Sequence, residues 1–314
     1  MRTLARLSPC SLLLVIACNG GQGDGESTDA MPTTMGTAVV TGTTAAVSTT
    51  DAPTTTGLGS TTAAPESSTG VADSSGGDES GTTEGEILLG PWLLTVDNGS
   101  NPPRLMRVGL DGGSTPICSL AATVDYTSVI FARDGTLYGH NAAANRIDVV
   151  DPCNCSFQIV GPTSLGSVVL SLGPADDDDL LAIDTDLDAL ARVDVGTGLA
   201  TAVGALGFFF GPSSIAWSDL IVQPYVVEGD NDFLYSVAVA TGESMALWPL
   251  SIDVTSPGLA VHPNDNGLYL CDGDMLYTVD PSNGMTLPVG SIGLEGSCQT
   301  LSPPQTAVDC IDRL

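Results

Sequence analysis

The chain has 314 residues, of which 37 are Asp or Glu and 8 are Lys or Arg, and its formal net charge is −29. All of the cations are Arg, so no lysine is available for Schiff-base chemistry, as an amine nucleophile or in a phosphate-binding loop. Binding to nucleic acid or to anionic lipid needs clustered cations, and this composition excludes both.

Residues 1–18 have the pattern of an export signal. Two arginines precede an apolar run over residues 12–16, which is shorter than the about 20 residues that a membrane-spanning helix needs. We therefore expect cleavage rather than a permanent anchor. The sequence Val-Ile-Ala-Cys at 15–18 resembles the bacterial lipobox, which implies that Cys18 is diacylated and becomes the mature N-terminus. An ordinary secretory signal is the alternative.

Residues 19–86 consist chiefly of Thr, Ser, Gly and Ala, with ten acidic residues and no basic one. Such a segment lacks the apolar mass that offsets ordering entropy, so we expect a disordered tether. A flexible chain of this length has a root-mean-square span of roughly 45 Å, enough to hold a domain off a membrane. Asn19 directly after the cysteine resembles the pattern of outer-membrane lipoproteins, which implies an outer-membrane or cell-surface location.

From residue 87 to residue 314 the sequence predicts an all-β domain built from repeats. Short runs of Leu, Val, Ile and Tyr alternate with Gly, Asp, Asn and Pro turns. Segments 190–204 and 276–290 share the pattern Leu-x-x-Val-Asp-x-x-x-Gly and end in Val-Gly. Equivalent anchor positions fall at 109, 151, 194, 238 and 280. A period of about 43 residues is the size of a four-stranded propeller blade.

Within each unit we expect an inner strand, a second strand, and then the motif and its continuation as the third and fourth strands. The inner strands are predicted at 129–133, 168–172, 214–217 and 259–262. The second strands are predicted at 136–139, 180–183, 220–222 and 268–270. The first unit has strands only near 92–96, 105–110 and 115–120.

The segment 298–301 follows the last repeat and has no unit of its own. Joining it to the incomplete first unit closes a ring of five blades and removes an exposed sheet edge. A ring of six blades would need about 30 more residues than the domain contains. We therefore expect a five-bladed β-propeller.

The repeat Leu-Tyr-x-Val-Asp-Pro-x-x-Gly-x-x-x-x-Val-Gly resembles that of YVTN/NHL-like and quinoprotein-like bacterial β-propellers. The resemblance covers 87–314 as a pattern and is close in 190–204 and 276–290. It implies the propeller fold. Because such propellers include both binding modules and enzymes, it does not select a function.

Three turns that follow predicted second strands are rich in carboxylates, and in a propeller they share one face. The candidate metal ligands in these turns are Asp184, Asp186, Asp188, Asp272 and Asp274. Converging carboxylates are suited to Ca²⁺, which takes six to eight oxygen ligands. Solvated turns in an acidic chain are the interpretation we favour, because no turn has the Gly and Glu placement of an EF-hand. The four aspartates at 176–179 are expected in a solvated turn on the opposite face.

Phe208, Phe209 and Phe210 precede an inner strand on the acidic face. Three adjacent residues cannot all point inward from a strand, so the loop either folds over the ring, which we favour, or exposes an apolar patch for a ligand or partner. His140 is expected in a turn on the same face and is the better candidate for ligand contact, whereas His262 is expected to be structural. No Gly-x-Ser-x-Gly, His-Glu-x-x-His or Cys-x-x-Cys motif occurs.

Six cysteines lie in 87–314, an even number that favours disulfides in an exported chain. Fifteen connectivities are open. We favour Cys271 with Cys298, because both fall at the same face of neighbouring blades. Cys153 and Cys155 occupy a turn that is Asp-x-x-x-Gly in other repeats, where a local bridge would stiffen the turn.

The sequence therefore predicts a lipoprotein, tethered to a membrane through Cys18, whose acidic propeller binds a protein or glycan partner without catalysis. The alternative is a lactonase-like or cyclase-like propeller hydrolase that uses a divalent cation held by carboxylates. Calorimetry with Ca²⁺ distinguishes the two.

Overall fold

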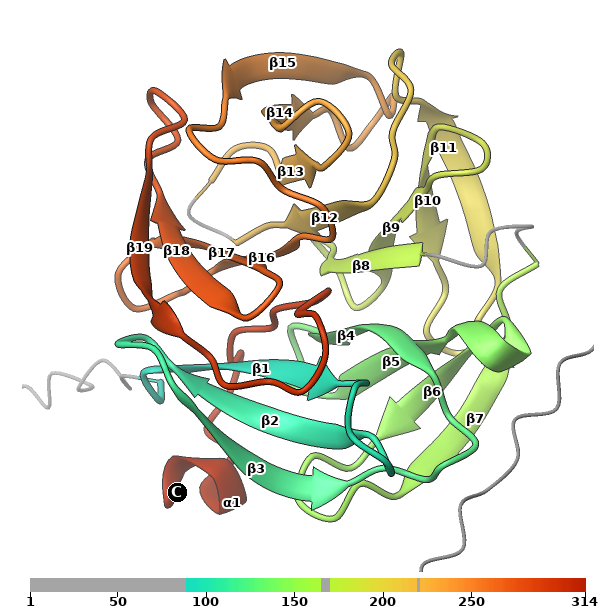
Figure 1. Cartoon of the computed structure of the whole chain (residues 1–314). Coiled ribbons are helices and arrows are strands. Elements are labelled where there is room, and N and C mark those ends of the chain that lie inside the picture. The colour runs from blue at the N-terminus through green and yellow to red at the C-terminus, as the bar shows by residue number, and fades with distance from the viewer. Residues whose placement is uncertain (1–88, 165–169, 219–220) are drawn as a thin grey trace, which may run out of the picture. The chain divides into compact units, whose positions relative to one another are not determined.

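The computed structural model of the chain describes residues 89–164, 170–218 and 221–314. These residues form five antiparallel sheets arranged in a ring, a five-bladed β-propeller (Figure 1). The predicted signal 1–18, including Cys18, and the predicted tether 19–86 lie outside the described residues. Among the described ranges, no helix is long and apolar enough to cross a membrane.

The first blade combines strands from both ends of the domain. Its outer strands are β1 (Trp92–Asp97), β2 (Arg104–Gly109) and β3 (Ser114–Ser119). On the inner side, the Leu94 amide donates to the Ser302 carbonyl (2.8 Å) and the Ser302 amide donates to the Leu94 carbonyl (2.9 Å). The C-terminal segment thus closes the ring, as predicted, with its pairing at Ser302 rather than within 298–301. Helix α1 (Asp309–Asp312) follows.

The other four blades each contain four strands in sequence order. The second blade consists of β4 (Tyr126–Phe131), β5 (Leu137–Asn141), the short helix η1 (Ala142–Ala144), β6 (Arg146–Val150) and β7 (Phe157–Pro162). The third consists of β8 (Leu170–Pro174), β9 (Leu180–Asp184), β10 (Ala189–Val193) and β11 (Ala200–Ala205). The fourth consists of β12 (Ser213–Ala216), β13 (Tyr225–Glu228), β14 (Phe233–Val237) and β15 (Ser244–Pro249). The fifth consists of β16 (Gly258–Val261), β17 (Leu268–Asp272), β18 (Met275–Val279) and β19 (Thr286–Ser291).

One predicted second strand is wrong. The apolar run at 220–222 precedes the strand, which is β13, and Val222 is 93% exposed. The pairing of Val226 with Tyr235 and of Val227 with Leu234 sets the register, and it buries both valines completely. A short apolar run without its pairing partners does not define a strand. The inner strand expected at 168–172 begins at Leu170, and residues 165–169 lie outside the described residues.

The apolar core lies between neighbouring blades rather than at the centre of the ring. Strands β5 and β9 are buried along their whole length, because each has a strand on both edges and a blade on both faces. The fourth strands form the outer edge and are largely open to solvent, as in β15, where Met245 and Trp248 are exposed. The faces of the blades therefore supply the burial that stabilises the fold.

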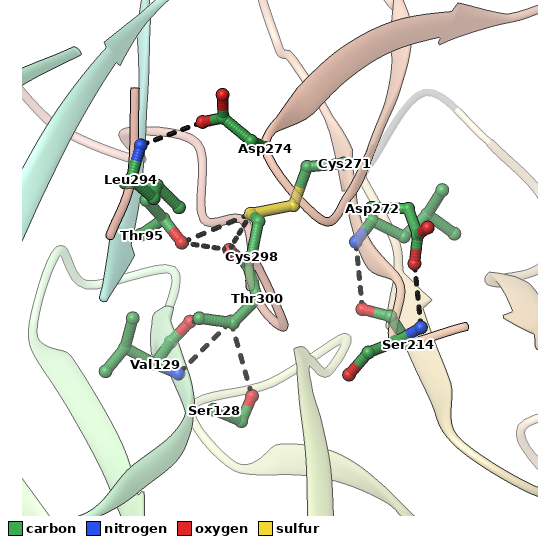
Figure 2. The surroundings of a disulfide bond; sticks show 12 residues. Thr95, Ser128, Val129, Ser214, Cys271, Asp272, Asp274, Leu294, Cys298 and Thr300 are labelled. Atoms are coloured by element: carbon green, nitrogen blue, oxygen red, sulfur yellow. Dashed lines mark hydrogen bonds between the residues drawn. A yellow bond between two sulfur atoms is a disulfide. The ribbon is translucent and has the colours of Figure 1, made fainter. Parts of the chain in front are cut away.

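A ring of hydroxyl side chains joins the inner strands. Each hydroxyl oxygen accepts a hydrogen bond from a backbone amide at the free edge of the next sheet, which satisfies a donor that would otherwise lack a partner. The pairs are Leu172 N with Ser128 Oγ (3.0 Å), Ile215 N with Ser171 Oγ (3.1 Å), Leu259 N with Ser214 Oγ (2.9 Å) and Val129 N with Thr300 Oγ1 (3.2 Å). In the fifth blade the equivalent position in this ring is Gly258, which has no hydroxyl. A Cβ there would lie 2.7 Å from the Thr300 backbone and from Cys271 Sγ, so no side chain fits. At that seam the connection is a disulfide (Figure 2).

Pairs of glycines make a second contact between blades, farther from the centre. A glycine of a turn between third and fourth strands packs on a fourth-strand glycine of the preceding blade. The pairs are Gly198 on Gly161, Gly242 on Gly204 and Gly112 on Gly290. The turn glycines have φ values of 78°, 77° and 89°. Both glycines of the repeat are therefore required, one for positive φ and one for the close approach of two backbones.

Cysteines replace this glycine pair between the first and second blades. Cys118 pairs with Leu105 in the same register position as Gly161 with Ile147, and Cys155 takes the turn position with φ of 61°. Cys118 and Cys155 form a disulfide. A covalent bond thus stands at a position where other seams have van der Waals contact.

Three disulfides occur in the described residues. Each one joins the second or the fifth blade to the first blade or to the C-terminal segment that completes it. They are Cys118–Cys155, Cys153–Cys310 and Cys271–Cys298, with sequence separations of 37, 157 and 27. The last is the pair favoured from the sequence. A local Cys153–Cys155 bridge was wrong, because ring closure brings β3 and α1 beside that turn and offers each cysteine a distant partner. The three bonds indicate an oxidising, extracytoplasmic environment.

Candidate functional site

The four carboxylates and one amide that end the second strands are placed to hold loops. Asp97, Asn141, Asp184, Glu228 and Asp272 are the last residues of β1, β5, β9, β13 and β17. Asp272 Oδ1, for example, accepts hydrogen bonds from the amides of Thr255 (2.9 Å) and Ser256 (2.7 Å), in the loop that enters β16. Glu228 Oε1 accepts from the Gly211 amide (3.2 Å) in the loop that enters β12. The loops between second and third strands and the loops that enter the next inner strand therefore lie on one face of the ring, which we call the acidic face.

A second set of carboxylates comes directly before the third strands. These side chains hold the loops that follow the fourth strands. Asp188 Oδ1 accepts from the Phe210 amide (2.8 Å), Asp232 Oδ1 from the Val254 amide (2.6 Å) and Asp274 Oδ1 from the Gly293 amide (2.6 Å). Hydrogen bonds to a charged acceptor contribute about 1.5–3 kcal/mol each. Hydrogen bonds to Asp274 also hold the pKa of its carboxyl below the usual range, against the effect of burial.

The five candidate metal ligands follow these two patterns. Asp184, Asp188, Asp272 and Asp274 accept backbone amides, and Asp186 is exposed. In the described part of the chain, no group of three or more His, Cys, Asp or Glu is arranged to hold a metal ion. Asp184 Oδ2 is buried and has no hydrogen-bond partner there. The aspartates at 176–179 lie in the turn between β8 and β9, where Arg192 Nη2 contacts Asp176 (2.6 Å) and Asp177 (3.0 Å).

Both histidines are buried and take part in internal hydrogen bonds. His140 lies within β5 rather than in a turn, with Nδ1 3.0 Å from Thr127 Oγ1 and Nε2 3.4 Å from Asn145 Oδ1. His262 Nε2 donates to the Gly90 carbonyl (3.1 Å). Burial lowers the pKa of both imidazoles, so both are neutral at pH 7. Neither side chain is open to a ligand.

The three phenylalanines divide between the core and the surface. Phe210 is fully buried, with its ring centroid 5.0 Å from that of Tyr235. Phe208 also packs on Tyr235 (5.7 Å) yet is 48% exposed, and Phe209 is 67% exposed. The favoured prediction of a buried loop therefore holds for Phe210, whereas Phe208 and Phe209 follow the alternative of an exposed apolar patch. The structure brings Phe209 to the acidic face and leaves His140 inside.

Two adjoining cavities open beside this loop. The central cavity, of about 230 Å³, is lined by Thr127, Ser171, Pro212, Ser213, Ser256, Pro257 and Gln299. Its lining residues lie at or just before the inner strands of successive blades, so it marks the end of the channel at the acidic face. A second cavity of about 250 Å³ is lined by Thr185, Asp186, Phe209, Phe210, Gly211 and Pro212. Pro212 belongs to both.

No protein-family model and no curated protein matches the chain. Similar solved structures include a Bacteroides thetaiotaomicron protein of unknown function (12% identity, 68% of this chain and 62% of that chain, TM-score 0.48). They also include virginiamycin B lyase from Staphylococcus aureus with quinupristin (14%, 60% and 63%, 0.41) and a nidogen/laminin complex (12%, 65% and 79%, 0.46). The chain thus spans 62% of the first structure's length. At these identities and TM-scores the similarity carries no argument about activity or ligand.

The central cavity is the feature that sequence reasoning missed. Its signal was present in the spacing, because small polar residues at 127, 171, 213, 256 and 299 recur with close to the blade period. The first four of these positions lie within two residues of the start of an inner strand, and their side chains line the end of the channel.

Proposed function

We propose that the protein is a surface-tethered lipoprotein whose propeller is a non-catalytic binding module, with its binding site on the acidic face around Phe209. The observation that supports this site is an exposed aromatic side chain held on a fixed loop next to two cavities. Exposed apolar side chains beside concave surfaces are typical of binding sites. Both histidines are buried, and the aspartates of the turns are used as loop anchors, which favours binding over catalysis.

The described chain enters the propeller on the face opposite the proposed binding site. The Leu89 amide donates to Asn264 Oδ1 (3.1 Å), and Asn264 Nδ2 donates to the Leu89 carbonyl (2.7 Å). Asn264 lies in the turn between β16 and β17, on the face opposite the acidic face.

The anchor is tested by metabolic labelling with palmitate. We expect label on the wild-type chain and none on Cys18→Ala. Protease added to intact cells should release the folded domain, which its disulfides protect. Label that persists in the Cys18→Ala chain would overturn the anchor.

The binding site is tested by photo-crosslinking on intact cells. A benzoylphenylalanine placed at Phe209 should form an adduct, because it inserts into C–H bonds of proteins and glycans alike. The matched control is the same residue at Leu287, which is 58% exposed on β19. Equal labelling at the two positions, or an adduct at Leu287 alone, would remove the site from the acidic face.

A further inference from the structure

The chemistry of the two cavities identifies a class of ligand. The side chains that line the central cavity are hydroxyls, one amide and two prolines, and none is charged. Pockets for drug-sized ligands have volumes of roughly 300–1,000 Å³. A cavity of about 230 Å³ therefore accepts one ring-sized polar group, and the adjoining cavity accepts the next part of the same ligand.

One polar group in the central cavity is left without a partner. Ser213 is 7% exposed, and its Oγ makes no hydrogen bond within the described part of the chain. Ser171 also lines this cavity, but its Oγ accepts the Ile215 amide and belongs to the ring that joins the blades, in which the fourth blade contributes Ser214 and not Ser213. A buried hydroxyl without a partner costs about 1–3 kcal/mol. The Oγ atom is itself covered, and rotation of the Ser213 side chain about χ1 would turn it to a ligand hydroxyl in the cavity.

The second cavity offers an aromatic face and polar groups. Phe209 presents an apolar ring surface, on which the C–H face of a sugar ring packs. Asp186 and Thr185 lie in the same lining and accept or exchange hydrogen bonds with hydroxyl groups. An apolar platform flanked by hydrogen-bonding groups matches a sugar ring, which is apolar on its faces and polar at its edge.

The loop that carries Phe209 is preorganised. The Phe210 amide is bound by Asp188 (2.8 Å), the Gly211 amide by Glu228 (3.2 Å), and the buried Phe210 ring packs on Tyr235. The backbone on the C-terminal side of Phe209 is therefore fixed before any ligand arrives. Binding then requires little ordering of the loop, which increases affinity.

Charge restricts the ligand further. Neither cavity has Arg in its lining, the chain has no lysine, and the one charged side chain in the two linings, Asp186, is negative. An anionic sugar would be repelled. A basic peptide would satisfy Asp186 but would not pair with the neutral hydroxyls of the central cavity. We propose that these two cavities bind the end of a neutral glycan, with one sugar ring among the hydroxyls and the next on Phe209. This inference rests on the proposed binding function.

The test is binding of the purified full chain, in a detergent without a sugar headgroup, to an array of neutral oligosaccharides. Matched oligosaccharides that end in a uronic acid and an Arg-rich peptide complete the array. We expect neutral glycans to bind. Phe209→Ala should weaken the best of them about ten-fold. Leu287→Ala, which truncates a similarly exposed apolar side chain on β19, should leave binding unchanged.

Ser213→Ala separates recognition from structural support. We expect it to weaken glycan binding about five-fold while the melting temperature stays the same or rises, because it removes an unsatisfied hydroxyl. A structural role would instead lower the melting temperature without a specific loss of binding. Glycan binding that Phe209→Ala and Ser213→Ala both leave intact overturns the assignment to these cavities.

The remaining outcomes distinguish this inference from the proposed function. If only the Arg-rich peptide binds, and Phe209→Ala abolishes that binding, the glycan inference fails and the binding module stands. If uronic-acid ends bind as well as neutral ones, the charge reasoning fails. If nothing on the array binds and the photo-crosslink at Phe209 is also absent, both proposals fail together.

Discussion

Removing the Cys153–Cys310 disulfide is expected to lower the stability of the ring more than any other single surface change. The bond joins the turn between β6 and β7 to α1 and spans 157 residues of sequence, most of the propeller. Cys153 is exposed and Cys310 is half-buried. Replacing both with Ser therefore disturbs little packing, and the change in stability reports on chain closure.

The magnitude follows from the length of the closed loop. In the chain-entropy model a crosslink lowers the entropy of the unfolded chain by an amount that grows with the logarithm of loop length. For a separation of 157 the model gives about 5 kcal/mol at 25 °C, against about 3.5 kcal/mol for the 27-residue separation of Cys271–Cys298. Typical folded domains have only 5–15 kcal/mol of stability, so the variant should be close to its limit.

Guanidinium unfolding of the Cys153→Ser/Cys310→Ser variant measures this loss. Arg313→Ala is the control for the C-terminal helix itself, because it removes only an exposed ion pair with Asp309 (3.0 Å) and should cost under about 0.5 kcal/mol. A loss below about 1 kcal/mol in the double variant would refute the reasoning and show that the backbone pairing at Ser302 closes the ring unaided.

Three further predictions use matched pairs of variants. Phe210→Ala should cost about 3–5 kcal/mol in denaturant unfolding, whereas exposed Phe209→Ala should cost under about 0.5 kcal/mol; equal losses would contradict the division between core and surface. Gly204→Ala should cost about 1–3 kcal/mol because its Cβ would overlap the Thr241 carbonyl, and Gly196→Ala, whose nearest neighbour is 3.3 Å away, should cost less. Because burial lowers the pKa of His140, the unfolded chain binds the proton first as pH falls below 6.5, so stability should drop between pH 7 and pH 5. His140→Gln should show a smaller drop, and a drop as large as in the wild type would show that His140 binds its proton equally well in the folded and unfolded chains.

Much of the fold was predictable because the repeat is local. Each unit of about 43 residues carries its own strand and turn signals, and a chain of equal units that buries its faces against neighbours has few architectures open to it. The segment 298–301 lacked a unit, so its place in the first blade followed from the need to cover an edge. Where a signal depended on pairing, as at 220–222, the prediction failed.

The candidate site was predicted less well. Asp184, Asp188, Asp272 and Asp274 were noticed for their charge, and the structure uses them to hold amides of loops from the same or the next blade. His140 was placed in a turn because the end of β5 could not be located from a short apolar pattern. Phe209 was identified, but its separation from Phe210 depends on Tyr235, which lies in another strand.

The acidic composition, the absence of lysine and the blade period were set by the sequence alone, and they determined the fold and the classes of ligand that are excluded. Tertiary structure decided the contacts between residues that lie one or more blades apart. Hydroxyls at 128, 171, 214 and 300 become a ring, Cys118 finds Cys155, and two cavities meet at Pro212 only when the ring closes. The physical reason is that a periodic sequence specifies each blade, whereas closure brings together side chains that no local pattern relates.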